Sequence, residues 1–153
     1  MGTALLIANA SAAPARDGAV IVDSGSTNTA GYKIELWSDG SGTVTLQNRF
    51  GETHGAAKTF AVSSALAQRF FADLKAARDG NAVSEPCMKS ASFGTTTHAQ
   101  WHGWNSPDLD CPAGNGLTAA LVSDVNAIRS ASGIGTMPLH RPLQAPPHVE
   151  ASP

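Results

Sequence analysis

Two runs of alternating side chains on either side of a short turn are the feature that most constrains the fold. Residues 32–37 and 43–47 each alternate apolar with polar side chains, and the stretch between them reads Ser-Asp-Gly-Ser-Gly. A period of two is typical of β-strands that bury one face, and an Asp-Gly pair favours a tight turn. The sequence therefore predicts an antiparallel β-hairpin here.

Shorter patterns indicate further strands around this hairpin. Residues 18–22 form a short apolar run, and residues 58–62 are predicted as another strand. Residues 95–101 begin with three threonines, which are β-branched and favour a strand over a helix. Residues 104–116 are rich in Pro, Asp and Gly and are expected to form a loop.

The spacing of apolar residues changes to a helical period in two places, which predicts two amphipathic helices. Ser63 or Ser64 can cap the first helix, and Gly80 and Asn81 suit its end. The residues that carry the two patterns are Leu66, Phe70, Leu74 and Ala77, and then Leu117, Leu121, Val125 and Ile128.

Strands joined by hairpins, then a helix, one or two strands and a second helix indicate an α+β domain. We expect an antiparallel sheet of four to six strands with both helices packed on one face, in two layers. The sequence predicts a leader like a signal peptide at residues 1–15, a single domain at residues 16–134, and a proline-rich disordered tail at residues 135–153.

Composition and charge exclude two classes of partner. Charged residues make up only 14% of the chain, the net charge is −2, and the Lys and Arg residues are scattered. A nucleic-acid interface needs a basic face, and a membrane span needs a longer apolar run than any present. We predict neither a nucleic-acid partner nor a membrane span.

The first residues are typical of an exported protein. Residues 4–8 are apolar, and Ala10, Ser11 and Ala12 form the small-x-small pattern of a signal-peptidase site. No Lys or Arg precedes the apolar run, as one would in a complete signal peptide, so a flexible alanine-rich leader is the alternative. We predict a periplasmic or extracellular protein.

Cys87 and Cys111 are the two cysteines of the chain, and neither lies in a Cys-x-x-Cys pair. Zinc and thioredoxin-like motifs are therefore not indicated. In an exported chain the two would form a disulfide, which contributes about 3 kcal/mol for a loop of this length. Two buried free thiols in a cytosolic protein are the alternative.

Three motifs resemble those of an uncharacterised family of small secreted bacterial proteins. They are Asp-Ser-Gly-Ser-Thr-Asn-Thr followed by Gly-Tyr at residues 23–32, Cys-Met-Lys-Ser-Ala-Ser-Phe-Gly at residues 87–94, and Ser-Pro-Asp-Leu-Asp-Cys at residues 106–111. The resemblance implies export and the disulfide. It implies no catalytic residues, because no activity is assigned to that family.

Asp23 raises the main question about chemistry. The stretch Ile-Val-Asp-Ser-Gly-Ser at residues 21–26 resembles the motif of retropepsin-like aspartic proteases, in which two carboxylates share one proton. A long helix in mid-chain is foreign to that all-β fold. Asp-Ser-Gly is also a frequent turn tripeptide, in which Asp accepts a hydrogen bond from its own backbone. We predict that Asp23 shapes a turn and is not a catalyst.

No catalytic, cofactor or metal site is predicted elsewhere. His98 and His102 lie four residues apart on a predicted strand, about 13 Å from each other, which is too far to share a zinc ion. Asp108 and Asp110 lack the spacing of an EF-hand loop, and Ser92 lacks the first glycine of a nucleophile elbow.

The sequence favours an exported, disulfide-stabilised binding or structural domain of the cell envelope over an enzyme. The partner could be a protein, a glycan or a small ligand, and the oligomeric state is not predicted. The alternative is a hydrolase of unrecognised type, retropepsin-like at Asp23. The candidates for a loop that contacts a ligand or partner are Asp23, Ser24, Ser26, Thr27, Asn28 and Trp104.

Overall fold

The computed structural model describes residues 16–134, and the structural statements below concern that part of the chain. The leader expected at residues 1–15 and the tail expected at residues 135–153 lie outside it. The strands are β1 (Gly18–Asp23), β2 (Gly31–Trp37), β3 (Ser41–Gln47), β4 (Thr53–Ala61), β5 (Thr97–Trp101) and β6 (Trp104–Asn105). The helices are α1 (Ser64–Gly80) and α2 (Gly116–Ala131).

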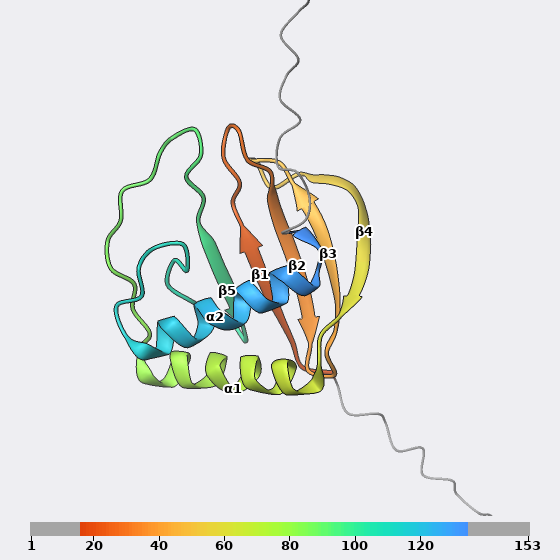
Figure 1. Cartoon of the computed structure of the whole chain (residues 1–153), viewed down its shortest axis with the longest axis vertical. Helices are drawn as coiled ribbons and strands as arrows, with labels where there is room; N and C mark the ends of the chain where they lie inside the picture. The colour runs from red at the N-terminus through yellow and green to blue at the C-terminus, as the bar shows by residue number, and fades with distance from the viewer. Residues whose placement is uncertain (1–15, 135–153) are drawn as a thin grey trace, which may run out of the picture.

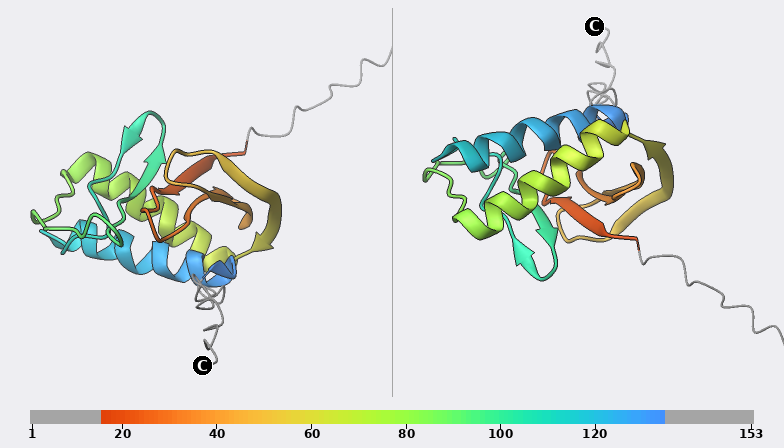
Figure 2. Two further views of the ribbon diagram at one scale, coloured as in Figure 1. Left: turned by 90° about the horizontal axis from the view of Figure 1, so that it is seen from above. Right: turned by 90° about the horizontal axis from the view of Figure 1, so that it is seen from below.

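The six strands form one antiparallel sheet in the order β4-β3-β2-β1-β5-β6. The two helices lie side by side across one face of this sheet (Figure 1, Figure 2). The predicted α+β class, with an antiparallel sheet and two helices, is confirmed. The main differences from the prediction are that β4 begins at Thr53 instead of residue 58, that β5 begins at Thr97 instead of residue 95, and that the two-residue strand β6 lies in the predicted loop.

The predicted hairpin is the pair β2 and β3, and its turn depends on Gly40. The Gly40 N–H donates to the Trp37 carbonyl at 2.9 Å, with Gly40 at a φ of 86°. A Cβ at this position would lie 2.7 Å from the Val62 carbonyl oxygen, which no side chain tolerates. Glycine is therefore required both for the turn and for the return of the chain from β4.

The core forms between the sheet and the helices, because one side of each alternating strand is apolar. Ile21, Ile34 and Leu36 from the sheet have no exposed surface, and neither do Phe70 and Leu74 of α1 or Leu121 and Ile128 of α2. Burying a side chain of this size contributes about 1.5–3 kcal/mol.

Both helices begin and end at capping residues. Ser63 accepts a hydrogen bond from the Leu66 N–H and caps α1, as predicted, and Asn81 in the left-handed conformation ends it. Asn115 caps α2 in the same way through the Thr118 N–H. Neither helix within residues 16–134 is both long and apolar enough to cross a membrane.

A buried carboxylate lies between the two helices. Asp124 of α2 has a side chain that is 1% exposed, and its Oδ1 accepts a 2.6 Å hydrogen bond from Nε of Arg69 on α1. Its Oδ2 has no partner within the described residues. Burial raises the pKa of Asp124 to about 6, with Arg69 opposing the rise and the nearby Asp73 adding to it.

Asp124 should make the free energy of unfolding fall as the pH rises from about 4 to about 6. A carboxyl whose pKa is raised in the folded state stabilises the fold fully below its ordinary pKa and loses that contribution as it ionises. Asp124→Asn should flatten this part of the pH profile of the melting temperature. Asp79→Asn on α1 is the control, because the pKa of Asp79 is lowered and lies below this window. An unchanged slope in the Asp124→Asn variant would contradict the assignment.

Candidate functional site

Asp23 ends β1 at the point where the chain turns back toward β2. Its Oδ1 accepts a 2.8 Å hydrogen bond from the Gly25 N–H, and Gly25 has a φ of 61°. A Cβ on Gly25 would lie 2.5 Å from the Gly31 nitrogen. The turn predicted from Asp-Ser-Gly is therefore present, and Asp23 shapes it from a position that is only 6% exposed.

The loop that follows, residues 23–29, is bonded to the second sequence motif through Ser92 and to Thr96 just after that motif. The Ser24 N–H donates to the Thr96 carbonyl at 2.9 Å, and the Thr96 N–H donates to the Ser24 hydroxyl at 3.0 Å. Further along, the Ser26 hydroxyl and the Asn28 N–H both donate to the Ser92 carbonyl, at 2.8 and 3.1 Å. Two motifs far apart in sequence thus form one surface at the end of the sheet.

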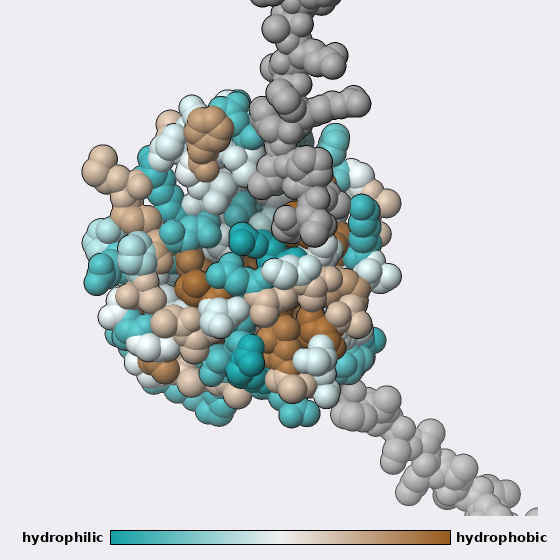
Figure 3. All heavy atoms as spheres, in the orientation of Figure 1, coloured by the Kyte–Doolittle hydropathy of each residue, from teal (hydrophilic) through white to brown (hydrophobic). Residues whose placement is uncertain are grey.

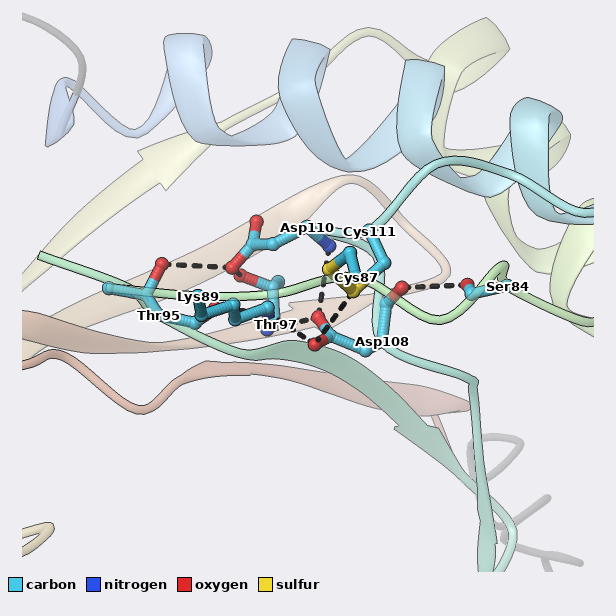
Figure 4. The surroundings of a disulfide bond; sticks show 8 residues. All are labelled: Ser84, Cys87, Lys89, Thr95, Thr97, Asp108, Asp110 and Cys111. Atoms are coloured by element: carbon cyan, nitrogen blue, oxygen red, sulfur yellow. Dashed lines mark hydrogen bonds and ion pairs between the residues drawn. A yellow bond between two sulfur atoms is a disulfide. The ribbon is translucent and has the colours of Figure 1, made fainter. Parts of the chain in front are cut away.

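The third motif joins them through Asp108 and the disulfide. Asp108 Oδ2 pairs with the Lys89 ammonium, and its Oδ1 accepts hydrogen bonds from the Thr97 and Asp110 N–H groups at 3.2 and 3.0 Å. Cys87 and Cys111 form a disulfide beside these residues, as predicted (Figure 4). The pKa of Asp108 is lowered: burial would raise it, but the bonds from Lys89 and the two N–H groups outweigh that effect.

The Thr97 hydroxyl lies between two carboxylates. It is 3.0 Å from Asp23 Oδ2 and 2.9 Å from Asp110 Oδ2. A hydroxyl has one hydrogen and can donate to only one of these oxygens. Asp23 is buried, whereas Asp110 is exposed and also accepts a 2.9 Å hydrogen bond from the Thr95 hydroxyl. The Thr97 hydroxyl therefore connects the end of β1 to the segment that carries Cys111.

The surroundings raise the pKa of Asp23. Burial is the largest cause, and the charge of Asp110 adds to it, against the lowering effect of the bonds from Gly25 and Thr97. Tyr32 stands directly opposite Asp23 in the β1–β2 ladder and is also buried. Its hydroxyl has no hydrogen-bond partner among residues 16–134, and burial and Asp23 together raise its pKa.

A cavity of about 470 Å³ lies on the other side of residues 23–29. Its walls are residues 26–30 of that loop and residues 46–50, which lead from β3 into the turn before β4. His54 of β4 completes the lining. Hydroxyl and amide groups from the loop thus face an apolar and basic wall that contains Arg49 and Phe50.

The structure brings five of the six predicted loop residues together and leaves the sixth apart. Asp23, Ser24, Ser26, Thr27 and Asn28 all lie where β1 ends. Trp104 lies at the opposite end of the sheet, since it pairs with Trp101 at the far end of β5. A separate cavity of about 410 Å³ borders it there.

The two histidines considered as metal ligands have separate roles. His98 Nδ1 is 2.9 Å from the Ser106 carbonyl, and His102 Nε2 is 2.8 Å from Asp17 Oδ1. Within residues 16–134, no three side chains of His, Cys, Asp or Glu are arranged to hold a metal ion.

Thr97, Arg49 and Phe50 belong to this end of the molecule, although the sequence does not predict them there. At Thr97 the sequence predicts a strand and no contact with Asp23. Arg49 and Phe50 follow strand β3 and belong to no motif. The pairing of β1 with β5 and the turn from β3 into β4 bring the three residues to this end, and no local sequence pattern predicts either arrangement.

Comparison of the chain with protein family models, curated proteins and solved structures gave no match. The resemblance inferred from the three motifs therefore stays a prediction. We infer function from the contacts of the described residues.

Replacing Asp23 by Asn should leave the protein at least as stable at pH 7. The new amide oxygen can still accept the Gly25 N–H, and the NH₂ group can donate to the Thr97 hydroxyl, which is then free to donate to Asp110. Asp23→Ala should lose about 1–3 kcal/mol, because it leaves the Gly25 N–H without an acceptor.

The pH profile separates this interpretation from a simple loss of contact. Because the pKa of Asp23 is raised in the folded state, its stabilisation is present at acid pH and is lost as the pH rises through the raised value. The Asp23→Asn variant should therefore gain most over the wild type above that pH in thermal melts. A melting temperature several degrees lower than that of the wild type at pH 7 would show that the carboxylate is needed in its charged form.

Removing the disulfide should destabilise the domain strongly. The double substitution Cys87→Ser with Cys111→Ser should lower the free energy of unfolding by about 3 kcal/mol, because the unfolded chain regains the freedom of a long loop. Dithiothreitol should lower the melting temperature of the wild type to about that of the double variant, and it should leave the melting temperature of the double variant unchanged. An insensitive wild type would mean that the bridge contributes nothing to stability.

Proposed function

We propose that this protein is an exported domain that binds a partner through the loops at one end of its sheet, and that it is not an enzyme. We call this surface the loop end: residues 23–29, the turn at residues 48–52, and residues 85–96. All three segments reach the same end of the sheet, residues 85–96 after running alongside it (Figure 1).

The observation that carries the proposal is a pair of exposed phenylalanines on either side of residues 23–29. Phe50 is 72% exposed in the turn before β4, and Phe93 is 67% exposed next to Ser92. Met88 in the same segment as Phe93 is fully exposed. Hydrophobic side chains project from hydrophilic surroundings at this end (Figure 3). Large apolar side chains gathered on one surface are typical of sites that a partner covers.

The base of the loop end is held firmly, which favours binding. Asp23, Thr97 and Asp108 bond the three motifs to each other, and the disulfide ties residue 87 to residue 111. A surface that is already ordered loses little conformational entropy when a partner binds. The exposed side chains therefore stand on a rigid support.

Export is supported by the disulfide together with the apolar leader. Disulfides persist in oxidising compartments and are rare in the cytosol. Residues 4–8 and the small residues at 10–12 have the pattern of a signal peptide. A periplasmic or extracellular location accounts for both features.

The alternative function, a hydrolase at Asp23, is supported by the closeness of Asp23 and Asp110 to one hydroxyl. The position of Asp23 argues against it. Both of its oxygens accept hydrogen bonds from the protein, and the residue is 6% exposed, so a substrate could not reach the carboxyl without displacing residues 23–29.

Binding should depend on the exposed phenylalanines. When immobilised, the double variant Phe50→Ser with Phe93→Ser should capture about tenfold less partner from a cell-envelope extract than the wild type does. Aromatic side chains that a partner buries each contribute about 1–3 kcal/mol to binding. Val83→Ser is the matched control, since Val83 is an exposed apolar residue outside the loop end. Melting temperatures of all three proteins should agree, as exposed substitutions change stability by only about 0.5 kcal/mol.

Two outcomes would contradict the proposal. One is equal retention by the wild type and the double variant. The other is cleavage of denatured casein at pH 4 by the wild type and not by the Asp23→Asn variant. Recovery of the mature protein in the periplasm or medium tests the export part separately.

A further inference from the structure

Two cavities on the core side of β3 and β4 meet and form one groove. The cavity of about 470 Å³ beside residues 26–30 and a second cavity of about 320 Å³ beside β4 are both lined by Leu46 and His54. The second continues along Val44, Lys58 and Ile134. We call the two together the basic groove. It runs from the loop end along β4 to Ile134, which follows the end of α2.

The register of β3 and β4 explains why this groove has an apolar floor and basic side chains over that floor. Val44 pairs with Lys58 and Leu46 pairs with His54, with a bulge between the two pairs. Paired residues share a face of the sheet, so the two basic side chains stand over the side on which Val44 is buried. The described helices leave most of β4 exposed, and the strand curves around the side of the sheet (Figure 2).

The charges around the groove are of one sign. Arg49, His54 and Lys58 line it, and among residues 16–134 no Asp or Glu lines either cavity. Neither Arg49 nor Lys58 forms an ion pair within residues 16–134. The nearest acidic residue of the turn, Glu52, accepts a 2.6 Å hydrogen bond from the Asn48 amide. Two cations therefore face an apolar floor without an acidic partner, which is complementary to an amphipathic anion.

Arg49 stands at the mouth of the groove and contacts both of its walls. Its Cζ lies 4.6 Å from the centroid of the Phe50 ring, and its Nη1 lies 3.4 Å from the Thr27 hydroxyl. A guanidinium held against an aromatic ring keeps most of its N–H donors free, and its planar fork matches a carboxylate. Phe50 and Leu46 give the apolar part of such a ligand a surface next to this anchor.

We propose that the basic groove binds a small organic carboxylate with an apolar body, with Arg49 at the mouth contacting the carboxylate and with Leu46, Val44 and Ile134 contacting the apolar part. The proposal rests on the proposed binding function and gives it a second ligand class at the edge of the same loop end. A volume of about 300–500 Å³ is at the lower end for sites of small molecules.

Titration of the full-length protein with octanoate, followed by calorimetry or by NMR shifts, tests the ligand class. Octanoate should bind with a millimolar or lower Kd at low ionic strength and about tenfold more weakly in roughly 0.5 M salt. Acetate lacks the apolar body and octyl glucoside lacks the charge, so each should bind about tenfold more weakly than octanoate. Equal binding of octyl glucoside would overturn the proposal.

Charge-removing variants locate the site. Arg49→Gln should weaken octanoate binding about tenfold, because a charged hydrogen bond in a partly enclosed site contributes about 1.5–3 kcal/mol. Lys58→Gln should weaken it less, because Lys58 pairs with Val44 beside the apolar part. Lys33→Gln is the matched control, since Lys33 lies on β2 and is already paired with Glu35 at 2.8 Å. Equal losses in all three variants would refute the site, and so would binding that appears only after residues 135–153 are removed.

The same titrations separate this proposal from the binding function on which it rests. Phe93→Ser removes an exposed residue that does not line the groove and should leave octanoate affinity unchanged. Octanoate binding without partner capture would refute the loop-end function alone. Partner capture that needs Phe93, with no octanoate binding, would refute the groove alone.

Discussion

The pairing of Asp23 with Gly25 and Thr97 is the contact on which the loop end depends. One carboxylate oxygen fixes the turn that leaves β1, and the other reaches the first residue of β5. Because Thr97 also contacts Asp110, the same hydroxyl connects the turn to the segment that carries Cys111. Three loops from distant parts of the sequence are held in place by a few buried polar contacts, at the cost of placing two carboxyls close together.

That arrangement accounts for the chemical character of the surface above it. With their backbone groups bonded to each other, residues 23–29 and 85–96 can present hydroxyl, amide and aromatic groups without being folded into the core. A small core makes such a support necessary, since loops of this length would otherwise be ordered only with a large loss of entropy. The disulfide also stabilises the folded loops, because it limits the conformational freedom of the unfolded chain.

Much of the fold follows from local patterns, and its exceptions have a common cause. The β2–β3 hairpin and both helices could be predicted because a buried face imposes a period on the sequence. The cap of α1 could be narrowed to Ser63 or Ser64, and the structure has Ser63. The first half of β4 could not be predicted, because residues 53–57 are all exposed and show no alternation of apolar and polar side chains. β6 is only two residues long and exists because it pairs with β5. In both cases pairing with a neighbouring strand decides the structure.

For the candidate site, local sequence is enough to predict the turn at Asp23, the disulfide partners and the polar character of residues 23–29. Each of these depends on residue type and on neighbours within a few positions, or on there being only two cysteines. Strand pairing, in contrast, is what brings Asp23 to Thr97 and Asp110, places Trp104 at the other end of the sheet, and gathers Arg49, His54 and Lys58 around one groove. The physical reason is that strand order and register set these distances, and many strand orders would bury the same apolar faces equally well.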